Sequence, residues 1–182
     1  MRTKIRNAIL SFPELFTATP FKPGDKPKFK TRFLVAKDDP QFATIKKDAV
    51  AALNGKFPGK GEAIWTQIQG NHNKCCIQDG DTLEYDGCSG HWVITANSSI
   101  RPQVRDRDGV TPITEADGRI YPGAVVHGLI DFFGYDNTGK GLSAALAGVQ
   151  FVRDGEPLGG GRGADDSDFE PITDGNDTDD LI

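Results

Sequence analysis

The stretch "KPKFKTRFLVAK", from Lys26 to Lys37, alternates basic and apolar side chains, which is typical of a half-buried β-strand. Successive side chains of a strand point to opposite faces. One face is then apolar except for a threonine: Phe29, Thr31, Phe33 and Val35. The other face carries three cations and a leucine: Lys28, Lys30, Arg32 and Leu34. The stretch therefore predicts a strand with cations on one side and rings on the other.

The rest of the chain has the same character. Its 22 Gly and 11 Pro separate short runs that are rich in β-branched and aromatic residues. The predicted strands are 6–12, 27–36, 91–99, 124–133 and 142–152. One helix is predicted over 40–53, where Phe42, Ile45, Ala49, Val50 and Leu53 fall at helical spacing before Asn54 and Gly55. We expect a mainly β fold.

Charge divides the chain of 182 residues into two parts. From Ala164 onward there are eight acidic residues and no Lys or Arg, so the preceding residues carry a net charge of +3 although the whole chain is at −5. Such a segment has few apolar residues to bury, so burial cannot offset the conformational entropy that the segment would lose on becoming ordered. We predict one domain over residues 1–158 and a flexible, disordered acidic tail over 159–182.

Two interpretations of the basic strand remain open. Lysines on a half-buried strand are most often a solvated face. The same alternation suits a groove for single-stranded nucleic acid, where rings stack on bases and cations neutralise phosphates. The presence of a basic strand and an acidic tail in one chain favours the second interpretation, a groove for single-stranded nucleic acid.

Three motifs were weighed as sites of chemistry. "GYDNTGKG", Gly134–Gly141, matches a phosphate-binding loop, but Gly141 stands where a Ser or Thr hydroxyl is needed, and a hairpin turn is the alternative. A closed zinc site is conceivable from two His and two Cys: His72, Cys75, Cys88 and His91. Paired carboxylates flank glycines in turn-like contexts: Asp79, Asp81, Asp106 and Asp108, with Asp131 in a predicted strand. We expect no catalytic residue, no cofactor and no bound metal.

No stretch reaches the roughly 18 consecutive apolar residues of a membrane span. The start, "MRTKIRNAIL", lacks the apolar core of a signal peptide, and the odd number of cysteines, two of them adjacent, suits a reducing compartment. We expect a cytosolic protein that has no membrane partner.

Several stretches together resemble a known family: "LSFPELF" (10–16), "KPKFKTRFLVAK", "DGCSGHWVITANSSIRPQVRD" (86–106), "IYPGAVVHGLIDFFGYDNTGKG" (120–141) and "GVQFVRDGEPLGGG" (148–161). In this order, and followed by an acidic tail, they resemble phage-encoded single-stranded DNA-binding proteins of the oligonucleotide/oligosaccharide-binding (OB) fold class. The resemblance covers nearly the whole chain.

The resemblance implies an OB-fold-like, five-stranded Greek-key barrel with one or two short helices. It also implies sequence-nonspecific binding of single-stranded DNA in phage replication, recombination and repair, without catalysis, in the cytoplasm of the infected bacterial host. Phosphate contacts are then expected from Lys28, Lys30, Arg32, Arg101 and Arg105, with His127 where an arginine would be expected. Stacking on bases is expected from some of Phe29, Trp65, Trp92, Tyr121, Phe133 and Tyr135.

For the tail, the resemblance implies a polyanion that competes for the DNA groove and recruits replication or recombination proteins. The residues concerned are Asp165, Asp166, Asp168, Phe169, Asp177, Asp179, Asp180 and Ile182. A merely solubilising tail is the simpler alternative. For the whole protein, the alternative is a non-enzymatic virion or adaptor protein whose aromatic β-surface binds another protein.

Overall fold

The computed structural model describes residues 2–158, 167 and 169–172, so most of the predicted tail lies outside the described residues. The strands are β1 (Arg2–Thr19), β2 (Lys28–Ala36), β3 (Ile77–Asp79), β4 (His91–Ser98), β5 (Gln103–Arg105), β6 (Val125–Asp136) and β7 (Lys140–Arg153). The helices are α1 (Gln41–Lys56) and α2 (Gly61–Ile68), with 3₁₀ turns at Gly80–Thr82 and Glu115–Asp117.

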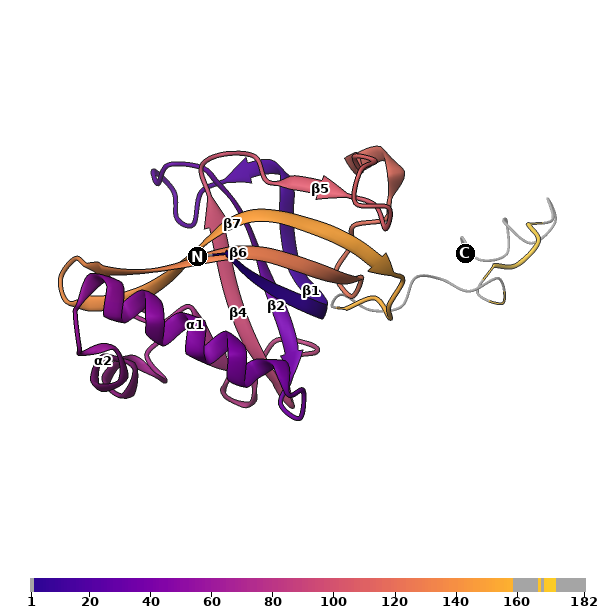
Figure 1. Cartoon of the computed structure of the whole chain (residues 1–182). Helices are drawn as coiled ribbons and strands as arrows, with labels where there is room; N and C mark the ends of the chain where they lie inside the picture. The colour runs from indigo at the N-terminus through magenta and orange to yellow at the C-terminus, as the bar shows by residue number, and fades with distance from the viewer. Residues whose placement is uncertain (1, 159–166, 168, 173–182) are drawn as a thin grey trace, which may run out of the picture.

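Five of these strands close into a barrel (Figure 1). β2 pairs with β1 and β4, and β6 pairs with β1 and β7, all antiparallel. The circle closes where β4 meets β7 in parallel, at Asn97 and Ala145. The short strands β3 and β5 extend the sheet from β4 and β7. The mainly β, five-stranded barrel expected from the sequence is confirmed, and β1 is longer than predicted.

β1 pairs with two neighbouring strands, and its pairing is irregular at three points. Its first half pairs with β6 and its second half with β2, and the register shifts near Asn7, near Phe12 and Pro13, and again between Glu14 and Thr19. Asn7 has φ 50° and Phe12 has φ 46°, in the left-handed region that side chains rarely adopt. Pro13 has no N–H for the ladder, which favours a bulge here. The second bulge leaves the ring of Phe12 on the outer surface.

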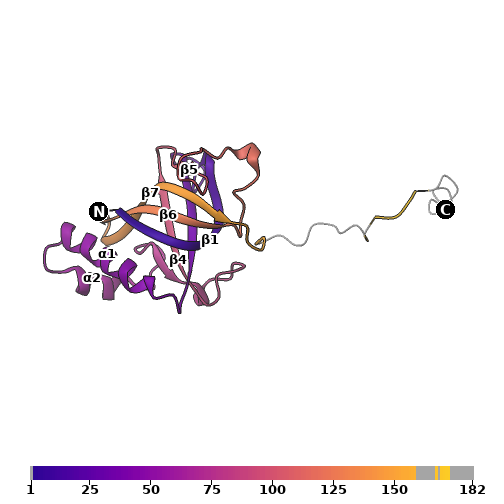
Figure 2. The same cartoon turned by 45° about the vertical axis from the view of Figure 1, so that its right-hand side comes forward.

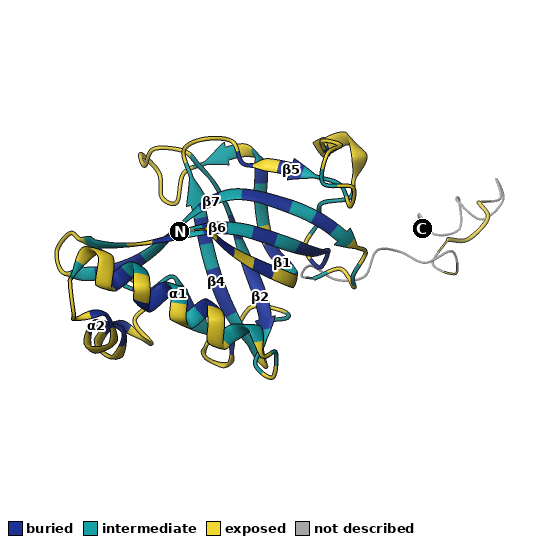
Figure 3. Ribbon diagram, in the orientation of Figure 1, coloured by how far each residue is buried: buried dark blue, intermediate teal, exposed yellow. Residues whose placement is uncertain are grey.

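The strand faces follow the predicted alternation. Thr31, Phe33 and Val35 are buried on the inner face of β2, while Lys30 and Arg32, on its other face, are partly exposed. Figure 3 shows how buried and less buried positions alternate along the barrel strands. Leu34, on the outward face, is also buried, because a second small cluster with Cys88 and Val93 covers it.

Both helices cover one side of the barrel, below it in Figures 1 and 2. α1 buries Ile45, Ala49, Val50 and Leu53, as its spacing predicts. α2 was not located from the sequence. It begins at Gly61, where an added Cβ would lie 2.6 Å from the Val50 carbonyl oxygen, so the two helices approach closely only because this residue is a glycine.

Residues 134–141 form a hairpin and no phosphate-binding loop. Asp136 pairs with Lys140 across a tight turn, and the chain after Gly141 continues as β7 instead of starting a helix. Among the described residues, no helix combines the length and apolarity needed to cross a membrane.

Candidate nucleic-acid interface

An open groove of about 990 Å³ runs over the outer face of the barrel. Its floor is formed by outward side chains of β2, β4 and β7, among them Arg32, Thr95, Asn97 and Ser143. Three loops and a hairpin form its walls: residues 20–27 between β1 and β2, 69–76 before β3, 83–90 before β4, and the β6–β7 hairpin. The groove thus lies where four separate parts of the chain converge.

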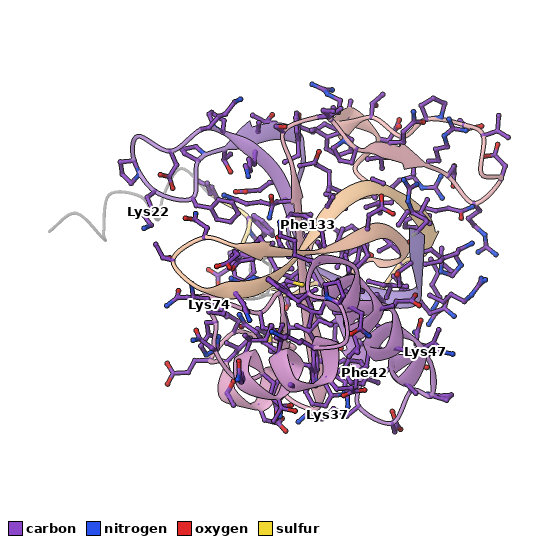
Figure 4. All side chains as sticks on the ribbon, turned by 60° about the vertical axis from the view of Figure 1, so that its left-hand side comes forward. Lys22, Lys37, Phe42, Lys47, Lys74 and Phe133 are labelled. Atoms are coloured by element: carbon purple, nitrogen blue, oxygen red, sulfur yellow. The ribbon has the colours of Figure 1, made fainter. Side chains whose placement is uncertain are left out.

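The charged groups of the groove are mostly cations. Lys22, Arg32 and Lys74 line it, and Asp25 is the acidic residue that lines it with them. In Figure 4, Lys22 and Lys74 lie on opposite sides of the β6–β7 hairpin. A cleft lined by one sign of charge concentrates ligands of the opposite sign, so this groove favours a polyanion.

Arg32 is held by rings instead of by carboxylates. Its guanidinium carbon lies 5.1 Å from the ring centroid of Phe12 and 4.8 Å from that of Tyr85. The two rings meet edge to face at 5.1 Å. Its Nη1 is buried and has no hydrogen-bond partner within the part of the chain that the structure describes. Arg32 thus lines the groove as a cation that packs against rings and keeps one donor without a partner.

Lys74 and Tyr135 hold the β6–β7 hairpin, which forms one wall of the groove, in place. Lys74 Nζ donates hydrogen bonds to the carbonyl oxygens of Asn137 (3.3 Å) and Thr138 (3.0 Å) at the turn. The Tyr135 hydroxyl donates to the Asn73 carbonyl oxygen at 3.2 Å. The Tyr135 ring lies directly over Gly141, where an added Cβ would come within 2.3 Å of it. Tyr135 can lie flat along the hairpin only because residue 141 is a glycine.

The structure brings some of the predicted DNA-contacting residues to this groove. Arg32 and Tyr135 line it. Lys30 lies beside it, but its charge is engaged, because Nζ is 3.3 Å from a carboxylate oxygen of Glu14. Phe133 is 47% exposed and lies two residues from Tyr135 along β6, hence on the same face of the strand (Figure 4).

Other predicted residues lie elsewhere. Lys28 is the first residue of β2, and Arg101 lies over the Phe29 ring. Arg101 and Arg105 line a separate pocket of about 570 Å³ beside Leu15 and Phe16. The remaining four residues have structural contacts. Trp65 is 7% exposed and packs in the core, and Trp92 stacks on Phe42. Tyr121 forms hydrogen bonds with Asp154 and Gly155, and His127 Nδ1 accepts a hydrogen bond from the Asn7 N–H.

Sequence reasoning missed most of the groove walls. Phe12, Phe21, Lys22, Lys74 and Tyr85 were not among the predicted contacts, although all but Phe12 line the groove and Phe12 covers Arg32. These residues belong to loops or to a bulge, and such segments have no periodic spacing of apolar residues that would indicate their position in the fold. The only available signal was composition, since Phe21 and Lys22 directly precede the basic strand.

The residues weighed for metal or acid chemistry have other surroundings. Cys75 is buried in the main core and Cys88 in the smaller cluster, and burial raises the pKa of both thiols. In residues 2–158, 167 and 169–172, no group of three or more His, Cys, Asp or Glu could hold a metal ion.

The paired carboxylates contact neighbouring groups of the chain. Asp79 and Asp81 form ion pairs with Lys37, Asp106 with Arg119, and Asp131 with Arg2. Asp108 accepts a hydrogen bond from the Thr111 N–H within its own loop.

Comparison with known proteins identifies the family. The family model described as the single-stranded DNA-binding protein of Enterobacter phage Enc34 matches residues 1–182. The chain belongs to this Enc34 family. It is a non-enzymatic family of phage proteins, in agreement with the absence of a predicted catalytic residue. A relative in Acyrthosiphon pisum secondary endosymbiont phage 1, protein p50, is 39% identical over 175 residues, which is 95% of each chain.

Solved structures agree with the Enc34 family assignment. The single-stranded DNA-binding protein of bacteriophage Enc34 in complex with single-stranded DNA has a TM-score of 0.70 at 27% identity, covering 87% of this chain and 89% of that one. The same phage protein without DNA gives 0.67 at 28% identity, covering 92% and 88%. The protein gp2.5 of bacteriophage T7, at 15% identity and a TM-score of 0.56 over 92% of each chain, shares the fold. The OB-fold-like architecture is thereby confirmed.

Proposed function

We propose that this chain binds single-stranded DNA in the groove over β2, β4 and β7, with little dependence on sequence. The observation that carries the proposal is Arg32, a cation that packs against two exposed rings and forms no ion pair with an acid among the described residues. Rings that stack on bases and cations that neutralise phosphates are what a nonspecific single-strand site needs. Lys22 and Lys74 extend the positive charge to both sides of the groove.

The position of the groove supports the same function. OB-fold proteins bind oligonucleotides over their second and third strands, between the loop joining strands one and two and the loop joining strands four and five. Here those elements are β2, β4, residues 20–27 and the β6–β7 hairpin, which together form the groove. The Enc34 protein, to which this chain is similar, has been solved in complex with single-stranded DNA.

We further propose that residues 1–158 form the DNA-binding domain and that residues 159–182 act as a polyanion which competes for the groove. Residues 164–182 contain eight acidic residues and no Lys or Arg, which supports this role, because the groove charges are mostly opposite in sign. When DNA displaces the tail, the tail becomes free to recruit replication, recombination or repair proteins in the host cytoplasm.

The experiment compares the full chain with a version that ends at Gly163. Binding to labelled oligo-dT, oligo-dA and a matched duplex is measured by fluorescence anisotropy at two salt concentrations. We expect tight, salt-sensitive binding to both single strands, and tighter binding without the tail. Absence of a preference for single strands at low salt would refute DNA binding by the groove, while equal affinity of the two versions would refute competition by the tail alone.

A further inference from the structure

A smaller pocket of about 220 Å³ opens from the groove between β1 and β2. It shares Phe21, Arg32 and Thr95 with the groove and is completed by Phe12, Glu14, Lys30 and Thr31. Its volume corresponds to about seven water molecules in the liquid. That is room for one flat ring system, but not for a run of nucleotides.

Two aromatic rings flank this pocket and both remain open to a ligand. Phe12 is 53% exposed and Phe21 is 51% exposed, which is unusual for large apolar side chains. Each ring is placed over a cation of β2: Phe12 over Arg32, and Phe21 over Lys30 with Nζ 4.1 Å from the ring centroid. Phe12 holds its position through a backbone in the left-handed region, which the fold retains although it is strained.

Several polar groups of the pocket have partners within the chain. Glu14 accepts a hydrogen bond from the Thr19 hydroxyl (2.5 Å) and forms an ion pair with Lys30 (3.3 Å), and the Thr31 hydroxyl donates to the Ser11 carbonyl oxygen. Arg32 also lines the pocket, and its Nη1 has no hydrogen-bond partner in the described chain. The guanidinium therefore keeps donor capacity for an acceptor on a ligand or on water.

We propose that this pocket captures a single base of the bound strand between Phe12 and Phe21, and that Arg32 makes guanine the preferred base. The proposal rests on the proposed binding of single-stranded DNA and adds a local preference to it. A guanidinium presents parallel donors that match the O6 and N7 acceptors of guanine, whereas adenine places an amino donor where O6 would be. Both purines have a π face that can stack on a ring, so the proposed preference is a property of the base edge.

The test measures binding of the full chain to an oligo-dA strand and to the same strand with one central guanine, hypoxanthine or 7-deazaguanine. Hypoxanthine keeps O6 and N7, and 7-deazaguanine lacks N7. We expect guanine and hypoxanthine to bind about five- to tenfold more tightly than adenine, with 7-deazaguanine in between. Arg32→Lys keeps the charge but loses the planar fork, so this variant should bind all four strands with similar affinity.

Phe133→Ala is the matched control, because it removes an equally exposed ring that does not line the pocket. It should leave the ratio between guanine and adenine strands unchanged, whereas Phe21→Ala should reduce that ratio. Equal affinity of the wild-type protein for the guanine and adenine strands would overturn the proposal, as would a guanine preference that survives in Arg32→Lys. Failure to bind any of the strands would instead refute the DNA-binding function itself.

Discussion

The guanidinium of Arg32 packs against the rings of both Phe12 and Tyr85, 5.1 Å and 4.8 Å from their centroids. Arg32 is on a regular strand, Phe12 on a bulge and Tyr85 in a loop, so three distinct local structures build one surface. Cations over rings are stabilised by the ring quadrupole, more so when water is excluded. This contact fixes the orientation of the main cation on the groove floor.

Replacing Tyr85 with alanine should weaken binding of oligo-dT by about 1 to 3 kcal/mol, the usual contribution of one stacking ring. The ring is half exposed and outside the core clusters, so the melting temperature should change little. Anisotropy titration and thermal unfolding measure the two effects. Ile100→Ala removes an exposed apolar side chain away from the groove and should change neither; loss of affinity in that control would mean that the effect is not local.

Lys22→Gln should reduce the salt dependence of binding. Each phosphate neutralised on a single strand contributes about 0.7 to the slope of log K against log salt concentration. If Lys22 contacts one phosphate, the slope should fall by about that amount. Lys47→Gln, on a helix surface that does not line the groove, is the charge-matched control and should keep the wild-type slope. If the salt slope fell equally in both variants, the effect would come from the net charge of the protein and not from a contact between Lys22 and a phosphate.

Gly141→Ala should weaken binding by displacing Tyr135. The new methyl group would overlap the Tyr135 ring, which lies against residue 141, and the ring would have to turn into the groove. Gly55→Ala adds a methyl group where nothing lies within 4 Å and should bind DNA normally. A crystal structure of Gly141→Ala with an unmoved Tyr135 would contradict this explanation.

His127 should make stability depend on pH. Burial, together with the nearby charges of Lys4 and Arg6, lowers its pKa below the ordinary 6.5, and its Nδ1 accepts a hydrogen bond from the strained Asn7 N–H. Because the unfolded chain takes up a proton before the folded one does, the stabilisation is complete above about pH 6.5 and decreases as pH falls toward the lowered pKa. Urea unfolding between pH 5 and 8 measures it. His127→Gln should flatten that dependence, and an unchanged pH profile in the variant would assign it to another group.

Five strands and one helix could be predicted from the sequence, whereas β3, β5, α2 and the walls of the groove could not. β2 and α1 follow from periodicity, because a partly buried strand or helix must repeat its apolar residues. Trp65 looked like a stacking ring because composition alone cannot tell a core ring from a surface ring, and it packs in the core. Lys74 and Tyr85 reach the groove only through the meeting of distant loops, which is a property of the closed barrel and leaves no local pattern.

Hydrogen exchange of the full chain with and without oligo-dT shows which surface of the barrel the DNA covers. We expect slower exchange in residues 20–26, 72–76, 83–86 and 134–138 on adding DNA, and no change on the outer surface of α1. Protection confined to residues 101–115, around Arg101 and Arg105, would contradict it and would place the DNA in the separate pocket beside β5 instead.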